Sequence, residues 1–196
     1  TLPTAPTKAG YTFTGWNPEV PATMPLNGTT CVAQWAINQY TITFDANGGN
    51  AVDPITQDYN SKVTLPTAPT KAGYTFTGWN PAVPTTMPLN GTTCVAQWTI
   101  NRYTIAFDSA GGTPIAHITQ DYNSEVTPPA APTKAGYTFN AWLPEVPKNM
   151  PAQNTNCVAL WAANQYTIIF DANGGNAVDP ITQDYDTEVT APDAPA

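Results

Sequence analysis

The sequence has little charge, a single histidine and no long apolar run. Only 10% of its 196 residues are charged, and fourteen acidic residues outweigh six basic ones, giving a formal net charge of -8. Such a surface does not attract the phosphates of nucleic acids or anionic lipids. No apolar stretch approaches the ~18 residues that cross a bilayer. The composition therefore predicts that this segment binds no nucleic acid and does not insert into a membrane.

Residues that commonly carry catalysis are also scarce. His117 is the only histidine, and no Cys-His or Ser-His-Asp pattern accompanies it, so we expect it to lie solvated in a loop. One aspartate per copy of the repeat described below precedes a tyrosine, and these single carboxylates are typical of turns rather than of acid–base pairs: Asp58, Asp121 and Asp184. The sequence predicts that the protein is not an enzyme, with no catalytic, cofactor-binding or metal-binding residues.

Proline and glycine are abundant and limit the fold class. Twenty-one prolines and thirteen glycines interrupt any long helical run. The segments between them are rich in Thr, Val, Ile, Tyr and Trp, which is the composition of short strands joined by turns. We therefore expect a mainly β fold.

The sequence repeats every 63 residues without insertion or deletion. The period relates four series of residues: Tyr11, Tyr74 and Tyr137; Trp16, Trp79 and Trp142; Cys31, Cys94 and Cys157; Trp35, Trp98 and Trp161. Residues 1–39 differ from 64–102 at only four positions. This near-identity indicates recent tandem duplication, which multiplies length and valency rather than building one unique active site.

Strands can be placed within one copy from local patterns. Apolar residues alternate with threonine in Tyr40–Phe44, and the Asp-Ala-Asn-Gly-Gly sequence at 45–49 then turns the chain back. We expect a second strand from Ile55 to Val63, a third that restarts at Tyr74 and bulges at Gly78-Trp79, and a last one over 92–98. The predicted core consists of Tyr40, Ile42, Phe44, Tyr74, Phe76, Trp79, Val95 and Trp98.

The string from Tyr40 to Trp98 opens with YTITFDANGG, has PTKAGYTFTGW at its centre and closes with VAQW. It resembles the Listeria–Bacteroides repeat, also called the internalin B-repeat family. The resemblance implies tandem α+β modules of the β-grasp type, similar to ubiquitin or SUMO, on secreted or cell-wall-anchored bacterial surface proteins. It implies no chemistry. Pro66 and Pro69 fall where the family has its helix, which argues against a helix here.

The β-grasp resemblance favours one phase of the repeat. It predicts the C-terminal half of a repeat, two complete repeats and the N-terminal half of another, at 1–39, 40–102, 103–165 and 166–196. The alternative phase has three permuted units, at 1–63, 64–126 and 127–189. The four-residue connection 99–102 is too short for the parallel pairing that a β-grasp fold needs in this second phase.

Three features have both a functional and a structural interpretation. Each copy has one cysteine, which is either a buried thiol or the site of an intermolecular disulfide. The loop at 45–50 is either a plain hairpin turn or a weak calcium loop that lacks the EF-hand glutamate. The six tryptophans either fill the cores or present faces that stack on sugars. In each case we expect the structural interpretation.

We therefore expect an extracellular, cell-surface or cell-wall-associated stalk. Its short connections restrict the orientations of neighbouring repeats, which are its main partners. We expect weak multivalent binding to a host or cell-surface protein or glycan. The half-repeats predict head-to-tail association, in which the tail of one chain completes the head of the next. The alternative function is a carbohydrate- or protein-binding module that uses exposed aromatic residues.

Overall fold

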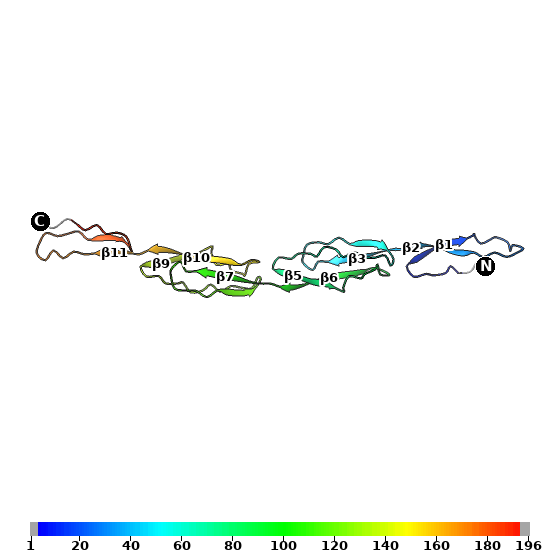
Figure 1. Ribbon diagram of the computed structural model, residues 1–196, viewed down its shortest axis with the longest axis horizontal. Helices are drawn as coiled ribbons and strands as arrows, with labels where there is room; N and C mark the ends of the chain where they lie inside the picture. Colours follow the sequence, from blue (N-terminus) through cyan, green and yellow to red (C-terminus); the bar gives the residue numbers. More distant parts are fainter. Residues whose placement is uncertain (1–3, 193–196) are drawn as a thin grey trace. The chain divides into compact units, whose positions relative to one another are not determined.

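The computed structural model describes residues 4–192, and all regular structure in this range is β-strand (Figure 1). The chain divides into two compact units, Thr1–Thr99 and Ile100–Ala196. Each unit holds one four-stranded and one two-stranded sheet. The prediction of a mainly β fold is confirmed, whereas the helix implied by the α+β class is absent from residues 4–192.

The first unit contains six strands: β1 (Tyr11–Asn17), β2 (Val32–Ile37), β3 (Gln39–Asp45), β4 (Ile55–Asp58), β5 (Tyr74–Asn80) and β6 (Thr92–Ile100). Strands β1 and β2 form an antiparallel pair. The other four are ordered β4-β3-β6-β5. The hairpin β3–β4 is antiparallel, and the two central strands β3 and β6 run parallel.

The second unit repeats these arrangements in the other order. Its strands are β7 (Arg102–Asp108), β8 (Ile118–Asp121), β9 (Tyr137–Leu143), β10 (Thr155–Ala163), β11 (Gln165–Ile168) and β12 (Ile181–Asp184). The four-stranded sheet is ordered β8-β7-β10-β9 and has β7 parallel to β10. Strands β11 and β12 pair antiparallel.

The alternating pattern of β3 separates a buried face from a threonine face. Ile42 is fully buried, while Thr43 points outward on the opposite face. The hydroxyl of Thr41 hydrogen-bonds that of Thr56 on β4 at 2.8 Å, and Thr43 bonds Thr93 on β6 at 2.7 Å. Threonine therefore supplies cross-strand hydrogen bonds where the sheet faces solvent.

The predicted second strand is too long. Strand β4 ends at Asp58 instead of Val63, because the chain turns at Asn60, whose φ is 61°. The Ser61 hydroxyl closes this turn by donating to the carbonyl oxygen of Asp58 at 2.6 Å. Val63 is nevertheless buried, and its backbone N–H donates to Thr85 O at 2.9 Å. The segment after the turn thus pairs with residues 85–87, in the connection between β5 and β6, instead of with β3.

The proline-rich segment 64–70 has no regular structure. Pro66 and Pro69 lack the backbone N–H that a helix or strand needs. The segment is held by the hairpin loop instead, since the N–H of Asn50 donates to Thr70 O at 3.0 Å and the Asn50 side-chain oxygen accepts from Thr70 N.

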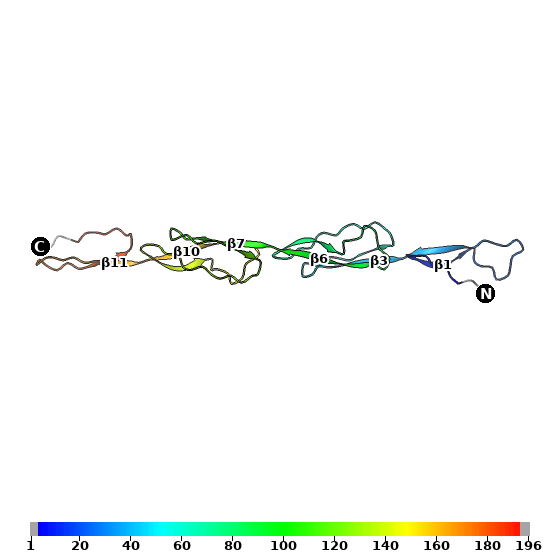
Figure 2. The same ribbon diagram turned by 90° about the horizontal axis from the view of Figure 1, so that it is seen from below.

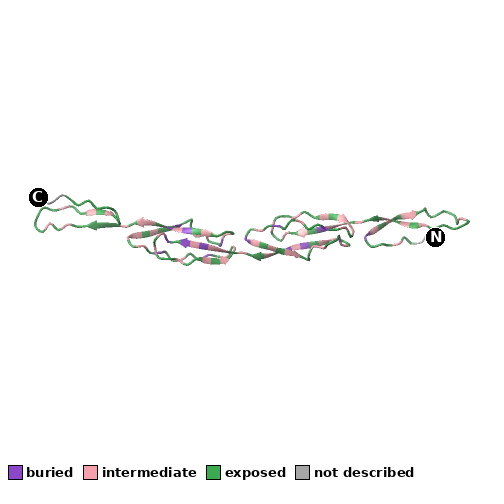
Figure 3. Cartoon of the chain, viewed as in Figure 1, coloured by how far each residue is buried: buried purple, intermediate pink, exposed green. Residues whose placement is uncertain are grey.

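The cores of the four-stranded sheets are small and alike (Figure 3). In the first, the buried residues are Ile42, Val63, Met87 and Cys94, with Tyr40, Phe44, Ile55, Trp79 and Val83 packed around them. The second contains the equivalents Ile105, Val126, Met150 and Cys157, together with Phe107, Trp142 and Ala159.

The predicted core is partly wrong. Tyr40, Ile42, Phe44 and Trp79 belong to it, whereas Tyr74 and Val95 lie outside it. Phe76 and Trp98 are not in this cluster, although their equivalents Phe139 and Trp161 pack against the core of the second copy. A bulge of the kind predicted at Gly78-Trp79 occurs near the equivalent glycine in the pair β1–β2, where the register shifts between Phe13 and Gly15.

Candidate functional site

The hairpin loop at 45–50 is tied to the last strand of its own repeat. The Trp98 indole N–H donates to Ala46 O at 3.1 Å, and the Asn47 side chain donates to Ala96 O at 3.2 Å. Gly49 allows this approach, because a Cβ there would lie 2.7 Å from the Trp98 ring. The loop therefore folds onto β6, and the tryptophan acts as a hydrogen-bond donor as well as an apolar group.

A lysine completes the same cluster. The Lys71 ammonium donates to Asn47 O at 3.0 Å and lies 4.5 Å from the centroid of the Tyr74 ring. In the second copy, Lys134 makes the equivalent bond to Ala110 O at 3.0 Å and sits over Tyr137. In these two loops the lysine ammonium thus lies at a backbone carbonyl oxygen, and its positive charge opposes binding of a metal cation there.

The described residues contain no group of three or more His, Cys, Asp or Glu side chains that could hold a metal ion. The Asp45 carboxylate instead accepts a hydrogen bond from the N–H of Asn47 at 2.8 Å. Asn47 has a φ of 47°. These are features of a tight hairpin turn, as the structural interpretation of this loop expects.

The cysteines differ in exposure. Cys94 and Cys157 are free thiols with no exposed surface, and burial raises the pKa of both. Cys31 is also a free thiol, but it is only half-buried and lines a surface hollow with Val20 and Met24. The buried-thiol interpretation therefore holds for the complete repeats, and Cys31 is the accessible thiol.

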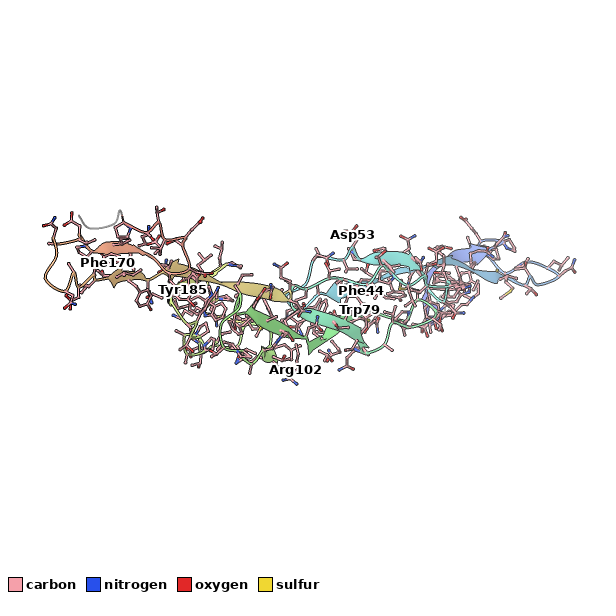
Figure 4. All side chains as sticks on the ribbon, turned by 60° about the vertical axis from the view of Figure 1, so that its left-hand side comes forward. Phe44, Asp53, Trp79, Arg102, Phe170 and Tyr185 are labelled. Atoms are coloured by element: carbon pink, nitrogen blue, oxygen red, sulfur yellow. The ribbon has the colours of Figure 1, made fainter. Side chains whose placement is uncertain are left out.

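The polar residues singled out in the sequence are not brought together. His117 is exposed in the loop before β8, as expected. Asp58 accepts a hydrogen bond from the Gln39 side chain at 3.0 Å, and Asp121 forms an exposed ion pair with Arg102 at 3.5 Å. Each of these aspartates therefore contacts the neighbouring strand of its hairpin, β3–β4 for Asp58 and β7–β8 for Asp121. Figure 4 shows Arg102 on the outer side of its sheet.

All six tryptophans lie among the described residues, and each is buried or half-buried. Trp79 packs against Phe44 with ring centroids 4.9 Å apart (Figure 4). Trp142 and Phe107 repeat this contact at 4.9 Å. The rings meet one another edge to face or tilted, so the tryptophans are packed against neighbouring aromatic residues.

Consecutive repeats are joined through a single asparagine. Strand β2 ends at Ile37 and β3 begins at Gln39, which leaves only Asn38 between them. The N–H of Asn38 donates to Gly10 O at 2.9 Å, and Asn38 O accepts from Tyr59 N at 2.8 Å. One residue therefore links the start of β1 to the turn after β4. The predicted four-residue connection at 99–102 is likewise reduced to Asn101, because β6 ends at Ile100 and β7 begins at Arg102.

Aromatic residues cover this joint. Tyr59 contacts Tyr11 from the preceding half-repeat and Tyr40 from its own repeat, with centroid distances of 6.4 and 6.1 Å. A Cβ at Gly10 would overlap the Tyr59 ring. Asn164, Gly136 and Tyr185 form the same joint in the second unit, with equal backbone distances of 2.9 and 2.8 Å.

The two half-repeats leave exposed what complete repeats bury. Met24 is 91% exposed, whereas its equivalents Met87 and Met150 are each 1% exposed. At the other end, Ile168 is 43% exposed, although Ile42 is fully buried. Each half-repeat thus exposes apolar side chains that are buried in a complete repeat. Figure 3 shows both ends of the chain as mostly exposed or half-buried.

The strands of the half-repeats are also shorter. Strand β11 stops at Ile168, whereas β3 continues for three more residues after the equivalent Ile42. Strand β2 begins at Val32, but β6 already begins three residues before the equivalent Val95. The missing residues are those that form the parallel β3–β6 pair in a complete repeat.

Sequence reasoning missed the lysine of the loop cluster and the asparagine of the joint. A signal was present for both, because Lys8, Lys71 and Lys134 recur at the repeat period, as do Asn38, Asn101 and Asn164. Their chemistry becomes visible only when the backbone carbonyls that they contact are placed.

The strand order defines the class of protein first. Residues 4–192 form small β sheets joined in tandem, and no helix in this range is long and apolar enough to cross a membrane. The family follows from the sequence model of the Listeria-Bacteroides repeat domain, which matches residues 1–32, 40–97, 103–153 and 166–196. The chain belongs to this family.

Similar proteins support this assignment. A putative Gly-rich membrane protein of Evansella cellulosilytica is 29% identical over 215 residues, which cover 96% of this chain and 25% of that protein. A putative membrane protein of the same organism is 31% identical over 182 residues, or 85% of this chain and 27% of that protein. Internalin H of Listeria monocytogenes is 43% identical over 117 residues, covering 50% of this chain and 21% of internalin H. The chain thus spans about a quarter of the length of these relatives.

Proposed function

We propose that this chain is a repeat segment of an extracellular bacterial surface protein, where its β-grasp repeats act as a spacer that presents another domain. The joint through Asn38 is the observation that carries this proposal. A single hydrogen-bonded residue and three tyrosine rings leave little freedom between adjacent repeats, as a semi-rigid spacer requires. The membrane-protein and internalin names of its relatives favour the cell surface.

The location is tested by labelling intact cells that make the parent protein. Antibodies raised against residues 1–196 should stain intact cells, and permeabilisation should add little signal. Added protease should remove the label while a cytoplasmic control protein stays intact. Staining that appears only after permeabilisation contradicts the proposal.

Weak multivalent binding to a host protein or glycan is a second part of this proposal. Repeated sites raise the apparent affinity with copy number, without any new contact. A chain lacking residues 40–102 should therefore bind a candidate glycoprotein surface more weakly than residues 1–196. Equal binding by both chains would contradict multivalent binding. The alternative of a carbohydrate platform has less support, because the tryptophan rings pack against neighbouring aromatic residues.

Head-to-tail self-association is favoured by the exposed faces of the half-repeats. The register of β3 and β6 pairs Ile42 with Thr92 and Phe44 with Cys94. The same register between two chains would pair Ile168 of one with Thr29 of the other, and Phe170 with Cys31. This pairing would cover Met24, which is 91% exposed.

Disulfide trapping tests this register. Phe170→Cys should form an interchain disulfide with Cys31 under mild oxidation, because the two positions would be neighbours on one face. Ile169→Cys is the matched control, since its side chain would point to the other face. Sedimentation of the unmodified chain should show mass rising with concentration. A constant monomer mass, or equal trapping by both variants, contradicts self-association.

A further inference from the structure

The path of the chain through a complete repeat has a mechanical consequence. The chain enters at Gln39, the start of β3, and leaves at Ile100, the end of β6. These two strands are central neighbours and run parallel, with β4 and β5 outside them. Figure 2 labels the two central strands, β3 and β6. The entry point and the exit point therefore lie at opposite ends of one strand pair.

Tension between these points pulls β3 and β6 in opposite directions along their length. The paired stretch joins residues 42–45 to 92–95, and it lies between the points of entry and exit. Its hydrogen bonds cross between the strands and are loaded together, in shear. The outer strands are not on the direct path of the load.

The half-repeats have the opposite geometry. In the antiparallel pair β1–β2, Tyr11 lies opposite Ile37, so the chain enters and leaves at the same end. In β11–β12, Gln165 lies opposite Asp184 in the same way. Tension would open these pairs one hydrogen bond at a time.

Side chains reinforce the parallel pair of the first complete repeat. Thr43 on β3 and Thr93 on β6 share a hydrogen bond of 2.7 Å on the outer face. On the inner face, Ile42 and Cys94 have no exposed surface. The second repeat has Ala106 opposite Asn156 at the threonine positions, and so lacks this hydroxyl bridge.

We propose that each complete repeat bears tension through its parallel central strands, β3–β6 and β7–β10, which act as a shear clamp. The inference rests on the proposed spacer function, because a spacer that presents a domain to a partner carries any force on that domain. It adds a mechanical role that such a spacer does not by itself require.

Single-molecule pulling on residues 1–196 from its two ends tests the clamp. The half-repeats should open first, at low force. Two abrupt events at higher force should follow, each releasing about 200 Å, since some 60 extended residues span ~3.3–3.6 Å each. Forced unfolding reports the rate of unfolding under load rather than equilibrium stability.

Two threonine variants give a matched comparison. Thr93→Ala removes a hydroxyl bridge across the loaded pair β3–β6. Thr56→Ala removes a bridge of the same kind, 2.8 Å long, across the unloaded pair β3–β4. Thr93→Ala should lower the unfolding force of one event, whereas Thr56→Ala should leave it unchanged. Chemical denaturation of both variants checks that their equilibrium losses are similar.

Several outcomes would overturn the clamp. Gradual extension without abrupt events, events at forces no higher than those of the half-repeats, or equal effects of Thr93→Ala and Thr56→Ala each contradict it. None of these results depends on where the protein resides. Surface labelling can therefore fail while the clamp holds, and the clamp can fail while surface labelling succeeds.

Discussion

At the scale of single residues, small and large side chains are paired at the joints. Gly10 has a φ of 78° and lies under the Tyr59 ring, so it meets both a conformational and a steric requirement for glycine. Gly28 has a similar φ of 68°, but nothing lies within 4 Å of its hypothetical Cβ. Comparing the two glycines therefore separates the cost of a left-handed backbone from the cost of a clash with the Tyr59 ring.

Gly10→Ala should destabilise the chain more than Gly28→Ala. Both substitutions place alanine in the left-handed region, which costs ~1–2 kcal/mol. Only the first also displaces Tyr59 from the joint. Calorimetry of both variants measures the difference in melting temperature. Equal losses would mean that the tyrosine contact adds nothing to the stability of the joint.

The buried thiols should make stability depend on alkaline pH. Burial raises the pKa of Cys94 and Cys157 in the folded state, so the folded chain keeps these protons longer than the unfolded chain. Their contribution is complete below the ordinary thiol pKa of about 8.5 and falls as the pH rises above it. Urea midpoints at pH 7 and pH 10 measure this loss. The double variant Cys94→Ala, Cys157→Ala should show a smaller loss, and an equal loss would exclude the thiols as a cause.

At the scale of elements, the same sequence forms different lengths of strand according to its partners. Residues 39–45 are all strand in β3, but only the equivalents of 39–42 are strand in β11. The difference in strand length follows from the parallel partner. Strand β3 pairs with the parallel strand β6, whereas β11 pairs only with the antiparallel strand β12. Strand length here is a property of the sheet and not only of the local sequence.

The methionine in the connection before the last strand of a repeat should contribute to stability only where its side chain is buried. Met87→Ala should cost about 2–5 kcal/mol, because the side chain is 1% exposed and its removal leaves a cavity. Met24→Ala removes the same side chain at the equivalent position, where it is 91% exposed, and should change stability by less than ~0.5 kcal/mol. Denaturant unfolding compares the two. A large loss for Met24→Ala would show that its half-repeat is covered in solution.

The strands and their turns could be predicted from the sequence because their signals are local. The Tyr40–Phe44 alternation and the Asp-Ala-Asn-Gly-Gly turn each depend on adjacent residues. Met87 was missed as a core residue because its burial depends on β3, 45 residues earlier in the chain. The donation of the Trp98 indole N–H to Ala46 O was missed, because it cannot be deduced from the spacing of the tryptophan.

At the scale of the whole molecule, the copies make the same contacts wherever both halves of a repeat are present. Phe44 and Trp79 are 4.9 Å apart, as are Phe107 and Trp142. Each four-stranded sheet has its own buried cluster. Stability should therefore be close to a sum of the stabilities of the repeats and of their joints.

Deletion of residues 40–102 tests this additivity. The deletion joins Gln39 to Tyr103 and restores an Asn-Gln-Tyr joint like that at 38–40. The shortened chain should remain folded, with a calorimetric enthalpy lower by about 40 kcal/mol, at ~0.7 kcal/mol per residue. Its melting temperature should change by only a few degrees. Loss of folding would show that the copies depend on one another beyond the joint.

The single asparagine between successive strands also limits how such a gene can evolve. Adding or removing one residue there would break the two backbone hydrogen bonds that Asn38 makes to Gly10 and Tyr59, although β3 would keep the register of its own sheet. Small insertions at this point should be eliminated by selection. Unequal recombination between near-identical copies keeps the joint intact, so descendants of this gene should differ in length by whole multiples of the repeat.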